Sequence, residues 1–205
     1  MKPRKKSSKI SVVISGMPSV GKTTAAEAVA KKFHLLHLAG GDMLKQMALE
    51  MGYRPSGSDW WDSPQGMAFL AARKKTADFD KEVDRRLIEN VRSGGVVITS
   101  YPVPWITKFG LKIWFAASPK TRAKRLAGRD SIAVEKALKI IRKRDSKNRL
   151  LYKKIYGIRF GDDLTPFNYI VDTERMDAAA VAKVTCKLVS EYRRGRKNDS
   201  RGSKL

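Results

Sequence analysis

The sequence predicts an α/β fold in which a five-stranded parallel sheet carries helices on both of its faces. Short apolar runs alternate with longer amphipathic patterns along most of the 205 residues, and this alternation is typical of βα units. A glycine-rich turn joins the first apolar run directly to the first helical pattern, at the edge of the sheet where such folds bind ligands. Hydrophobic residues make up 42% of the chain, which is enough for the core of one domain.

Five apolar runs are the predicted strands, because each is short and bounded by turn or helix signals. They are "ISVVIS" (10–15), "LLHL" (35–38), "GVVITS" (95–100), "LKIWFAA" (111–117) and "FNYIVDT" (167–173). The helical patterns between them cover 21–33, 43–52 with Asp42 as N-cap, 79–94, 118–128, 131–156 and 176–192. Two long intervals, about 43–78 and 128–160, are expected to be flaps that move over the carboxyl edge of the sheet.

The formal charge of +23 at pH 7 is concentrated in three segments. The first nine residues carry five basic side chains, residues 193–205 have a net charge of +5, and residues 120–160 have a net charge of +12. Residues 1–9 and 193–205 are also poor in apolar side chains, so we expect two disordered tails around one domain of residues 10–192. Basic tails can contact RNA through its phosphates, although solubility explains tails this short equally well.

Cysteine content and hydropathy indicate the compartment. The single cysteine, Cys186, excludes an internal disulfide and fits a reducing environment. No apolar run approaches the ~20 residues that a membrane span needs. The apolar stretch after the basic N-terminus is too short for a signal peptide and leads directly into the glycine turn. We therefore expect a cytoplasmic protein that does not enter a membrane.

Residues 16–23, "GMPSVGKT", match the phosphate-binding P-loop, with a strand before and a helix after. The glycines let successive backbone N–H groups point at an anion, and the helix start adds the positive end of its dipole. Lys22 is placed to reach the β- and γ-phosphates of a bound nucleotide, and the Thr23 hydroxyl is a ligand for Mg²⁺. The residues expected to bind the nucleotide phosphates are Gly16, Met17, Pro18, Ser19, Val20, Gly21, Lys22, Thr23 and Thr24.

The class of P-loop protein follows from what the sequence lacks. A GTPase needs a base-reading segment such as Asn-Lys-x-Asp, and the sequence has none. A motor ATPase needs an acidic residue at the end of a strand beside the loop, where this chain has Thr99, Ser100 and Tyr101. These absences favour a small kinase.

Arginines in the basic segment meet a chemical need of such a kinase. Moving phosphate between two anionic groups requires cations that suppress their repulsion, and guanidinium groups bind phosphate oxygens in pairs. Spacing puts Arg125 and Arg129 on one helix face and Arg142 and Arg149 on another, with Arg144 between. The alternative is a solvated basic helix or an RNA-binding surface.

On the acceptor side, Asp84 is suited to read an amino group of a base, and Arg85 or Arg86 to bind a phosphate. Surface pairing, such as Glu82 with Arg86, explains these side chains equally well. The Trp60-Trp61 pair is suited to stack on a base, or to pack within its own loop.

Several motifs keep a specific order and spacing across residues 10–192. They are "ISGMPSVGKTT", "LAGGDMLKQMALEMG", "FDKEVDRR", "RLAGRDSIAVEKAL" and "RDSKNRLLYKKIYGI". In these motifs the chain resembles the archaeal-type cytidylate kinases. The resemblance implies a P-loop kinase with a nucleotide-monophosphate-binding flap and a helical lid, which uses ATP and Mg²⁺ to phosphorylate CMP or dCMP. It also implies that Lys22, Arg129 and Arg144 are catalytic, and that CMP is bound by Asp42, Lys45, Asp84, Arg85 and Arg149.

Two departures from that family concern the acceptor. Lys45 stands where arginine is common, and Thr99-Ser100-Tyr101 replaces a common Glu-Gly-Arg, which removes an acceptor-binding arginine and a carboxylate near the metal. We expect a monomeric CMP kinase. The alternatives are a kinase for UMP or AMP, and an RNA-associated protein that binds ATP without phosphorylating nucleotides.

Overall fold

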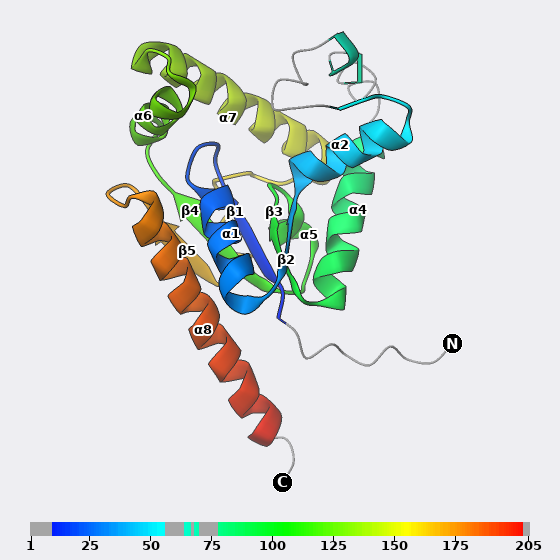
Figure 1. Cartoon of the computed structure of the whole chain (residues 1–205), viewed down its shortest axis with the longest axis vertical. Helices are drawn as coiled ribbons and strands as arrows, with labels where there is room; N and C mark the ends of the chain where they lie inside the picture. Colours follow the sequence, from blue (N-terminus) through cyan, green and yellow to red (C-terminus); the bar gives the residue numbers. More distant parts are fainter. Residues whose placement is uncertain (1–9, 56–63, 67, 70–77, 203–205) are drawn as a thin grey trace.

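The computed structural model describes residues 10–55, 64–66, 68–69 and 78–202, and Figure 1 shows how their elements are arranged. The N-terminal tail, the Trp60-Trp61 pair, part of the first predicted flap and residues 203–205 lie outside these ranges.

All five predicted strands are present and form one parallel sheet. They are β1 (Val12–Gly16), β2 (Leu36–Ala39), β3 (Val96–Thr99), β4 (Leu111–Ala116) and β5 (Tyr169–Asp172). Their order across the sheet is β2-β3-β1-β4-β5, with Val12 of β1 opposite Val97 of β3 and Gly16 opposite Phe115 of β4. Because the strands share one direction, their carboxyl ends meet along a single edge, where the glycine turn follows β1.

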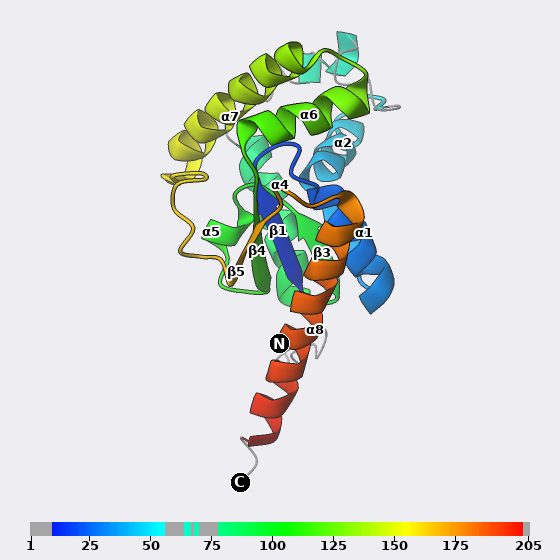
Figure 2. The same cartoon turned by 90° about the vertical axis from the view of Figure 1, so that its left-hand side faces the viewer.

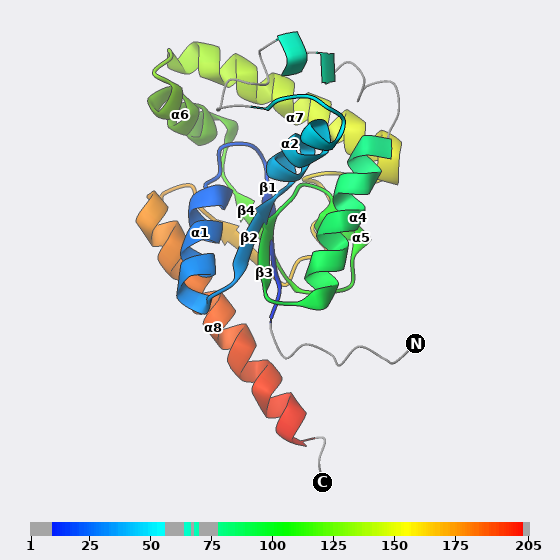
Figure 3. The same cartoon turned by 45° about the vertical axis from the view of Figure 1, so that its right-hand side comes forward.

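Helices cover both faces of the sheet, as the sequence predicts. They are α1 (Lys22–Phe33), α2 (Gly40–Glu50), α4 (Asp78–Ser93), α5 (Val103–Ile106), α6 (Pro119–Asp130), α7 (Val134–Tyr156) and α8 (Ala178–Gly202). Ile14 of β1 shares a buried cluster with Val29 of α1 and Val189 of α8. Its neighbour Val13 points to the other face and shares a cluster with Leu87 of α4, as strand alternation requires. Figures 1 and 3 show α1 and α8 on one side of the sheet and α4 on the other.

Helices α6 and α7 form a hairpin that lies across the carboxyl edge of the sheet (Figures 1 and 2). Small and branched side chains hold the two helices together: Ala123, Leu126 and Ala127 of α6, with Ala137 and Ile141 of α7. This hairpin contains most of the second predicted flap.

A buried ion pair connects the hairpin to the glycine turn. Arg122 of α6 donates to both carboxylate oxygens of Asp145 in α7, at 2.9 and 2.7 Å. Arg122 also donates to the carbonyl oxygens of Ala117 (3.1 Å) and Pro18 (3.4 Å). The side chains of the pair are only 3% and 8% exposed, so each charge depends on the other for its stabilisation.

One predicted helix start is wrong, and one short helix was not predicted. Helix α2 begins at Gly40 with Ala39 as N-cap, so Asp42 lies inside the first turn and is not the cap. The Asp42 carboxylate still faces the positive end of the helix dipole from that position. Short α5, which follows Pro102, is absent from the predicted elements.

The predicted disorder of the C-terminal tail is also wrong over residues 193–202, because α8 continues to Gly202. Buried Val181 and Val189 anchor the helix on the sheet, and arginine and lysine are good helix formers that extend an existing helix at little cost. Figures 1 and 2 show the end of α8 extending beyond the sheet, on the side away from α6 and α7. None of the described helices is long and apolar enough to cross a membrane.

The buried pair gives the first testable prediction. Asp145→Ala leaves the Arg122 guanidinium charged and unpaired in the interior, so we expect the free energy of unfolding to fall by about 3–5 kcal/mol. Urea denaturation followed by circular dichroism measures this change.

The double variant Arg122→Met/Asp145→Leu removes both charges and is expected to recover most of the lost stability. The matched control is Asp130→Ala, because Asp130 also pairs with an arginine but at the exposed surface, with Arg129 at 2.7 Å. If Asp145→Ala and Asp130→Ala lowered the free energy of unfolding equally, the prediction that removing one partner of the buried pair is the more destabilising change would be contradicted.

Candidate active site

The glycine turn between β1 and α1 has a backbone that only glycine tolerates at two points. Gly16 has φ +149°, and a Cβ there would lie 2.5 Å from the carbonyl oxygen of Phe115 in β4. Gly21 has φ +90° and is the N-cap of α1. These conformations bend the chain around its own amides, which is the geometry of a phosphate-binding loop.

Lys22, the first residue of α1, folds back over this loop. Its Nζ donates to the carbonyl oxygens of Gly16 and Met17, both at 2.8 Å. The same ammonium lies 4.9 Å from the ring centroid of Tyr101. Desolvation of the ammonium, followed by repulsion from Arg144 and Arg122, lowers the pKa of Lys22 to about 7. The loop therefore holds a cation at a real electrostatic cost, which a bound anion would remove.

An outer cavity of about 770 Å³ opens on the far side of the loop. Its lining combines the loop and the start of α1 with side chains of α6 and the chain just before and within α8. The lining includes Lys22, Thr23, Tyr101, Arg125, Arg129 and Arg144. A basic cavity of this size, with backbone amides at its base, suits a nucleoside triphosphate.

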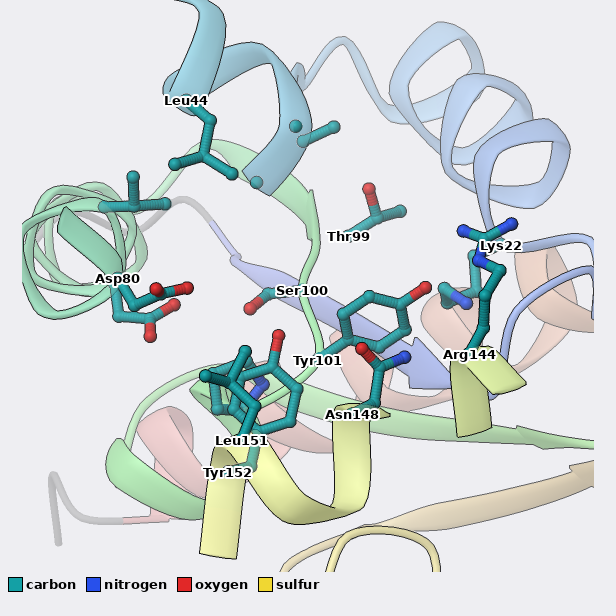
Figure 4. Close-up of a pocket in the computed structure, with 16 residues that line it drawn as sticks. Lys22, Leu44, Asp80, Thr99, Ser100, Tyr101, Arg144, Asn148, Leu151 and Tyr152 are labelled. Atoms are coloured by element: carbon teal, nitrogen blue, oxygen red, sulfur yellow. The ribbon is translucent and has the colours of Figure 1, made fainter. Parts of the chain in front are cut away.

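An inner cavity of about 400 Å³ lies at the carboxyl edge of the sheet (Figure 4). It is walled by α2, α4, the end of β3 and α7. The lining includes Lys22, Asp80, Asp84, Ser100, Tyr101, Arg144, Asn148 and Tyr152. Figure 4 shows Asp80 at one end and Lys22 with Arg144 at the other, so the cavity has an acidic end and a basic end.

Three residues line both cavities, as far as the described chain extends: Lys22, Tyr101 and Arg144. They come from α1, the segment after β3, and α7, which the fold brings together at the carboxyl edge. We call these three residues the shared wall. A chemical group that passes from one cavity to the other must pass this wall.

The acidic end of the inner cavity is held by α4 and α7. Asp80 and Asp84 are one helical turn apart and only 8% and 5% exposed. The Tyr156 hydroxyl of α7 donates to Asp84 Oδ2 at 2.7 Å. Burial, together with this contact to Asp84, raises the pKa of Tyr156, so the phenol stays a proton donor. Two acceptor groups are thus fixed at the end of the cavity away from the cations.

The predicted arginines divide between different sites. Arg129 lines the outer cavity and pairs with Asp130, and Arg144 belongs to the shared wall. Arg125 also borders the outer cavity, but its guanidinium donates to Thr173 Oγ1 (3.1 Å) and to the carbonyl of Met176 (3.0 Å). It therefore fastens α6 to the chain that follows β5.

Arg142 and Arg149 share a face of α7, as their spacing predicts, but that face lines a third cavity of about 390 Å³ with Met17 and Trp114. The structure does not bring Arg149 together with Asp84 and Arg144. Five residues along an α-helix are a rotation of about 140° beyond a full turn, so Arg144 and Arg149 point to different flanks of α7.

Besides Arg149, three residues predicted to bind CMP do not line the inner cavity in the part of the chain described. Asp42 is exposed, and Lys45 is half-buried on the next turn of α2. Arg85 is exposed on α4 and pairs with Glu82 at 2.7 Å and with Glu89. The alternative of surface pairing is confirmed for Arg86, which donates to Glu82 and to Glu50 of α2, both at 2.8 Å.

Sequence reasoning missed several residues of the inner cavity. Asp80 precedes Asp84 by four residues and Asn148 follows Arg144 by four, so helical spacing could have found both once one member of each pair was placed. In the sequence, Tyr101 stands out only as a departure from the Glu-Gly-Arg of the family. Its ring is fixed by edge contacts with Phe160 (5.4 Å) and a tilted contact with Tyr152 (6.0 Å), which the sequence does not reveal.

The residues around the loop fit a magnesium ion that is bound mainly by phosphate. Within the described ranges, no group of three or more His, Cys, Asp or Glu side chains could hold a metal by itself. Thr23 offers one hydroxyl at the start of α1, in the lining of the outer cavity. Mg²⁺ commonly takes few protein ligands and completes its shell with waters and substrate phosphates, so a single hydroxyl is sufficient.

Comparisons with curated proteins identify close relatives. A family model described as "AAA domain" matches residues 12–150. The chain is 31% identical to the cytidylate kinase of Methanocaldococcus jannaschii over 188 aligned residues, and this alignment covers 89% of this chain and 99% of that protein. It is 33% identical over 174 residues to the cytidylate kinase of Pyrococcus horikoshii, which covers 84% of each.

Solved structures support the fold. An uncharacterized protein from Eubacterium ventriosum superimposes with a TM-score of 0.65 at 15% identity, over 89% of this chain and 99% of that one. The shikimate kinase of Acinetobacter baumannii, in complex with shikimate, gives a TM-score of 0.56 at 14% identity, over 90% and 93% of the two chains. At these identities the likeness is one of fold alone, and it confirms the predicted P-loop α/β architecture.

Lys22 gives the second testable prediction. Lys22→Met removes the ammonium but keeps an unbranched side chain over the loop, so ATP is expected to bind at least about 10-fold more weakly. Isothermal titration calorimetry with ATP measures the change.

The same variant is expected to unfold no more easily than the wild type at pH 7. The folded state lowers the pKa of Lys22 from 10.5 to about 7, so the charged ammonium destabilises the folded protein. This destabilisation is complete below pH 7 and disappears as the pH rises towards 10.5. Unaltered ATP affinity in a folded Lys22→Met protein would contradict the assignment of the loop.

Proposed function

Because the chain belongs to the cytidylate kinase family, we propose that it transfers the γ-phosphoryl group of ATP to CMP or dCMP. The observation that carries this proposal is the shared wall of Lys22, Tyr101 and Arg144 between the outer and inner cavities. A donor nucleotide in one cavity and an acceptor in the other would meet at that wall.

In this proposal ATP occupies the outer cavity. The backbone N–H groups of residues 16–24 other than Pro18, including those at the start of α1, bind its phosphates, and Lys22 contacts the β- and γ-phosphates. Arg129 faces the same phosphates from α6. The Thr23 hydroxyl would hold Mg²⁺, which neutralises phosphate charge when it is bound.

The acceptor occupies the inner cavity, with its phosphate towards Arg144 and its base towards Asp80 and Asp84. A carboxylate only accepts hydrogen bonds, so it pairs with the exocyclic amino group of cytosine. Uracil has a carbonyl oxygen at that position, which a carboxylate repels. The proposal thus keeps Asp84 among the predicted CMP contacts and adds Asp80, which supports cytosine over uracil.

The reaction needs little covalent help from the protein. An oxygen of the CMP phosphate attacks the γ-phosphorus of ATP, and the bond from that phosphorus to the oxygen bridging to the β-phosphate breaks. The attacking oxygen is already anionic, so no strong general base is required. Positioning of the two nucleotides and neutralisation of charge by Lys22, Arg129 and Arg144 carry the catalysis.

The domain organisation follows from the same assignment. The hairpin of α6 and α7 serves as the lid over ATP, and the interval of residues 43–78 serves as the flap over the nucleoside monophosphate. Each proposed site is complete within a single chain, so the proposed enzyme acts as a monomer. The free, buried thiol of Cys186 supports a reducing cytoplasm as its compartment.

A coupled ADP-release assay with CMP, dCMP, UMP, AMP and GMP tests the proposal. We expect CMP or dCMP to give the highest kcat/KM. A higher value for UMP or AMP would select the alternative monophosphate kinase. Absence of ADP release with every acceptor would select the ATP-binding protein that does not phosphorylate nucleotides.

The variant Asp84→Asn tests the contact with the base. It replaces a carboxylate, which only accepts hydrogen bonds, by an amide, which can also donate one to the uracil carbonyl. We expect the preference for CMP over UMP to fall by about 10-fold or more. Glu89→Gln is the matched control, since Glu89 is an exposed acidic residue of the same helix that pairs with Arg85. The proposed base contact is excluded if both variants keep the wild-type ratio.

We also propose that the end of α8 makes a weak, sequence-independent contact with RNA. Arg193, Arg194 and Arg196 are exposed beyond Tyr192, the last apolar residue of the helix packed on the core. Cations without apolar neighbours suit phosphate contacts, whose affinity falls steeply with salt.

Fluorescence polarisation with a labelled single-stranded RNA tests this contact, as a function of salt concentration. Residues 193–205 carry a net charge of +5. Their deletion is expected to reduce the slope of the logarithm of RNA affinity against the logarithm of salt concentration by about 3, and to leave turnover unchanged. Lys136→Gln/Lys139→Gln, on exposed positions of α7, controls for a general loss of charge. RNA affinity that survives the deletion would remove the contact.

A further inference from the structure

We propose that the Tyr101 hydroxyl donates a hydrogen bond to the phosphoryl group as it passes between the two cavities, and so acts as a further catalytic residue beside Lys22, Arg129 and Arg144. The inference rests on the proposed function and deepens it. It assigns a neutral donor to the point of transfer, in addition to the two cations of the shared wall.

The position of Tyr101 is the first argument. It is the member of the shared wall that comes from the sheet, directly after Thr99 and Ser100 at the carboxyl end of β3. The other two members approach from α1 and α7. The transferring group passes between the outer and inner cavities, so every residue of this wall lies within its path.

The second argument is that Tyr101 is held rigidly. Its ring contacts Phe160 and Tyr152, with centroids 5.4 and 6.0 Å away. Its carbonyl oxygen accepts a hydrogen bond from Ser15 Oγ of β1 at 3.0 Å. A donor fixed in this way needs no reorganisation when charge develops on the phosphoryl oxygens, and such preorganisation is what accelerates phosphoryl transfer.

The third argument is the direction of the hydroxyl. Figure 4 shows it pointing away from the acidic end of the cavity, towards Lys22 and Arg144. The face of the same ring lies 4.9 Å from the Lys22 ammonium. Tyr101 therefore stabilises one cation with its ring and presents its proton beside both cations, where a phosphoryl group would be bound.

A neutral donor also suits the charge balance of the wall. Arg144 and Arg122 already help to lower the pKa of Lys22 to about 7, so a third cation at this point would weaken the ammonium further. Burial raises the pKa of Tyr101, although the charge of Arg144 and hydrogen bonds from Arg144 and Asn148 to the hydroxyl oxygen oppose the effect. The phenol therefore remains protonated, and its own proton is available to an anion. The hydroxyl keeps its proton throughout: it stabilises the equatorial oxygens while the acceptor oxygen bonds to phosphorus and the bridging oxygen leaves with ADP.

Tyr101→Phe tests the inference, because it removes one oxygen and keeps the ring, its packing and its contact with Lys22. We expect kcat for CMP phosphorylation to fall about 10- to 100-fold, with the KM values for ATP and CMP changed by less than about 3-fold. Tyr169→Phe, a half-buried tyrosine of β5 that lines neither cavity, is the matched control and is expected to keep the wild-type rate.

A second measurement separates catalysis from structure. Binding of the transition-state mimic formed by ADP, aluminium fluoride and CMP is expected to weaken in Tyr101→Phe by the same factor as kcat, while ATP affinity and the thermal unfolding midpoint stay unchanged. An unchanged kcat, or a loss that appears in KM alone, would overturn the inference and leave CMP kinase activity standing. A wild-type protein that phosphorylates no nucleotide would remove both.

Discussion

Two phosphate groups repel each other, and the site is built around the cations that allow them to meet. Lys22 and Arg144 lie close enough for Arg144 to help lower the pKa of Lys22, which means that the folded chain holds positive charge where water solvates it poorly. Such an arrangement costs free energy until an anion arrives. The ring of Tyr101 and the carbonyl oxygens of Gly16 and Met17 offset part of that cost.

The fold supplies the elements that hold these cations in place. Gly16 permits the tight turn out of β1, since a Cβ there would collide with the backbone of β4. The Arg122–Asp145 pair fixes α7, and with it Arg144, to α6 and to the carbonyl oxygen of Pro18 in the loop. At the opposite end of the inner cavity lie the buried carboxylates of α4, and in the proposed complex this separation of charge orients the nucleotide with its phosphate towards the wall and its amino-bearing base towards α4.

The sequence was sufficient for the strands, the loop and the family, because these depend on local patterns: apolar runs, glycine spacing and motif order. It was insufficient wherever a side chain's role depends on the packing of elements far apart in the chain. The spacing of Arg142 and Arg149 correctly gave them one face of α7, but only the packing of α7 against α6 decides that this face turns to the third cavity. In the sequence, Tyr101 is a residue that stands where the family commonly has arginine. Its position between two cavities becomes visible only when α1, α7 and the end of β3 meet at one edge of the sheet. Low apolar content predicts disorder at the C-terminus, but a helix that is already anchored on the core extends without apolar residues, as α8 does.

The central claim is that one chain binds donor and acceptor in two cavities that share the wall of Lys22, Tyr101 and Arg144. A crystal structure with a bisubstrate ligand, adenosine and cytidine joined through five phosphates, tests it most directly. We expect one ligand to span both cavities, with its middle phosphates against the shared wall and the cytosine amino group within hydrogen-bond distance of Asp80 or Asp84. A ligand bound through its adenosine half alone, with the cytidine half outside the inner cavity, would contradict the claim.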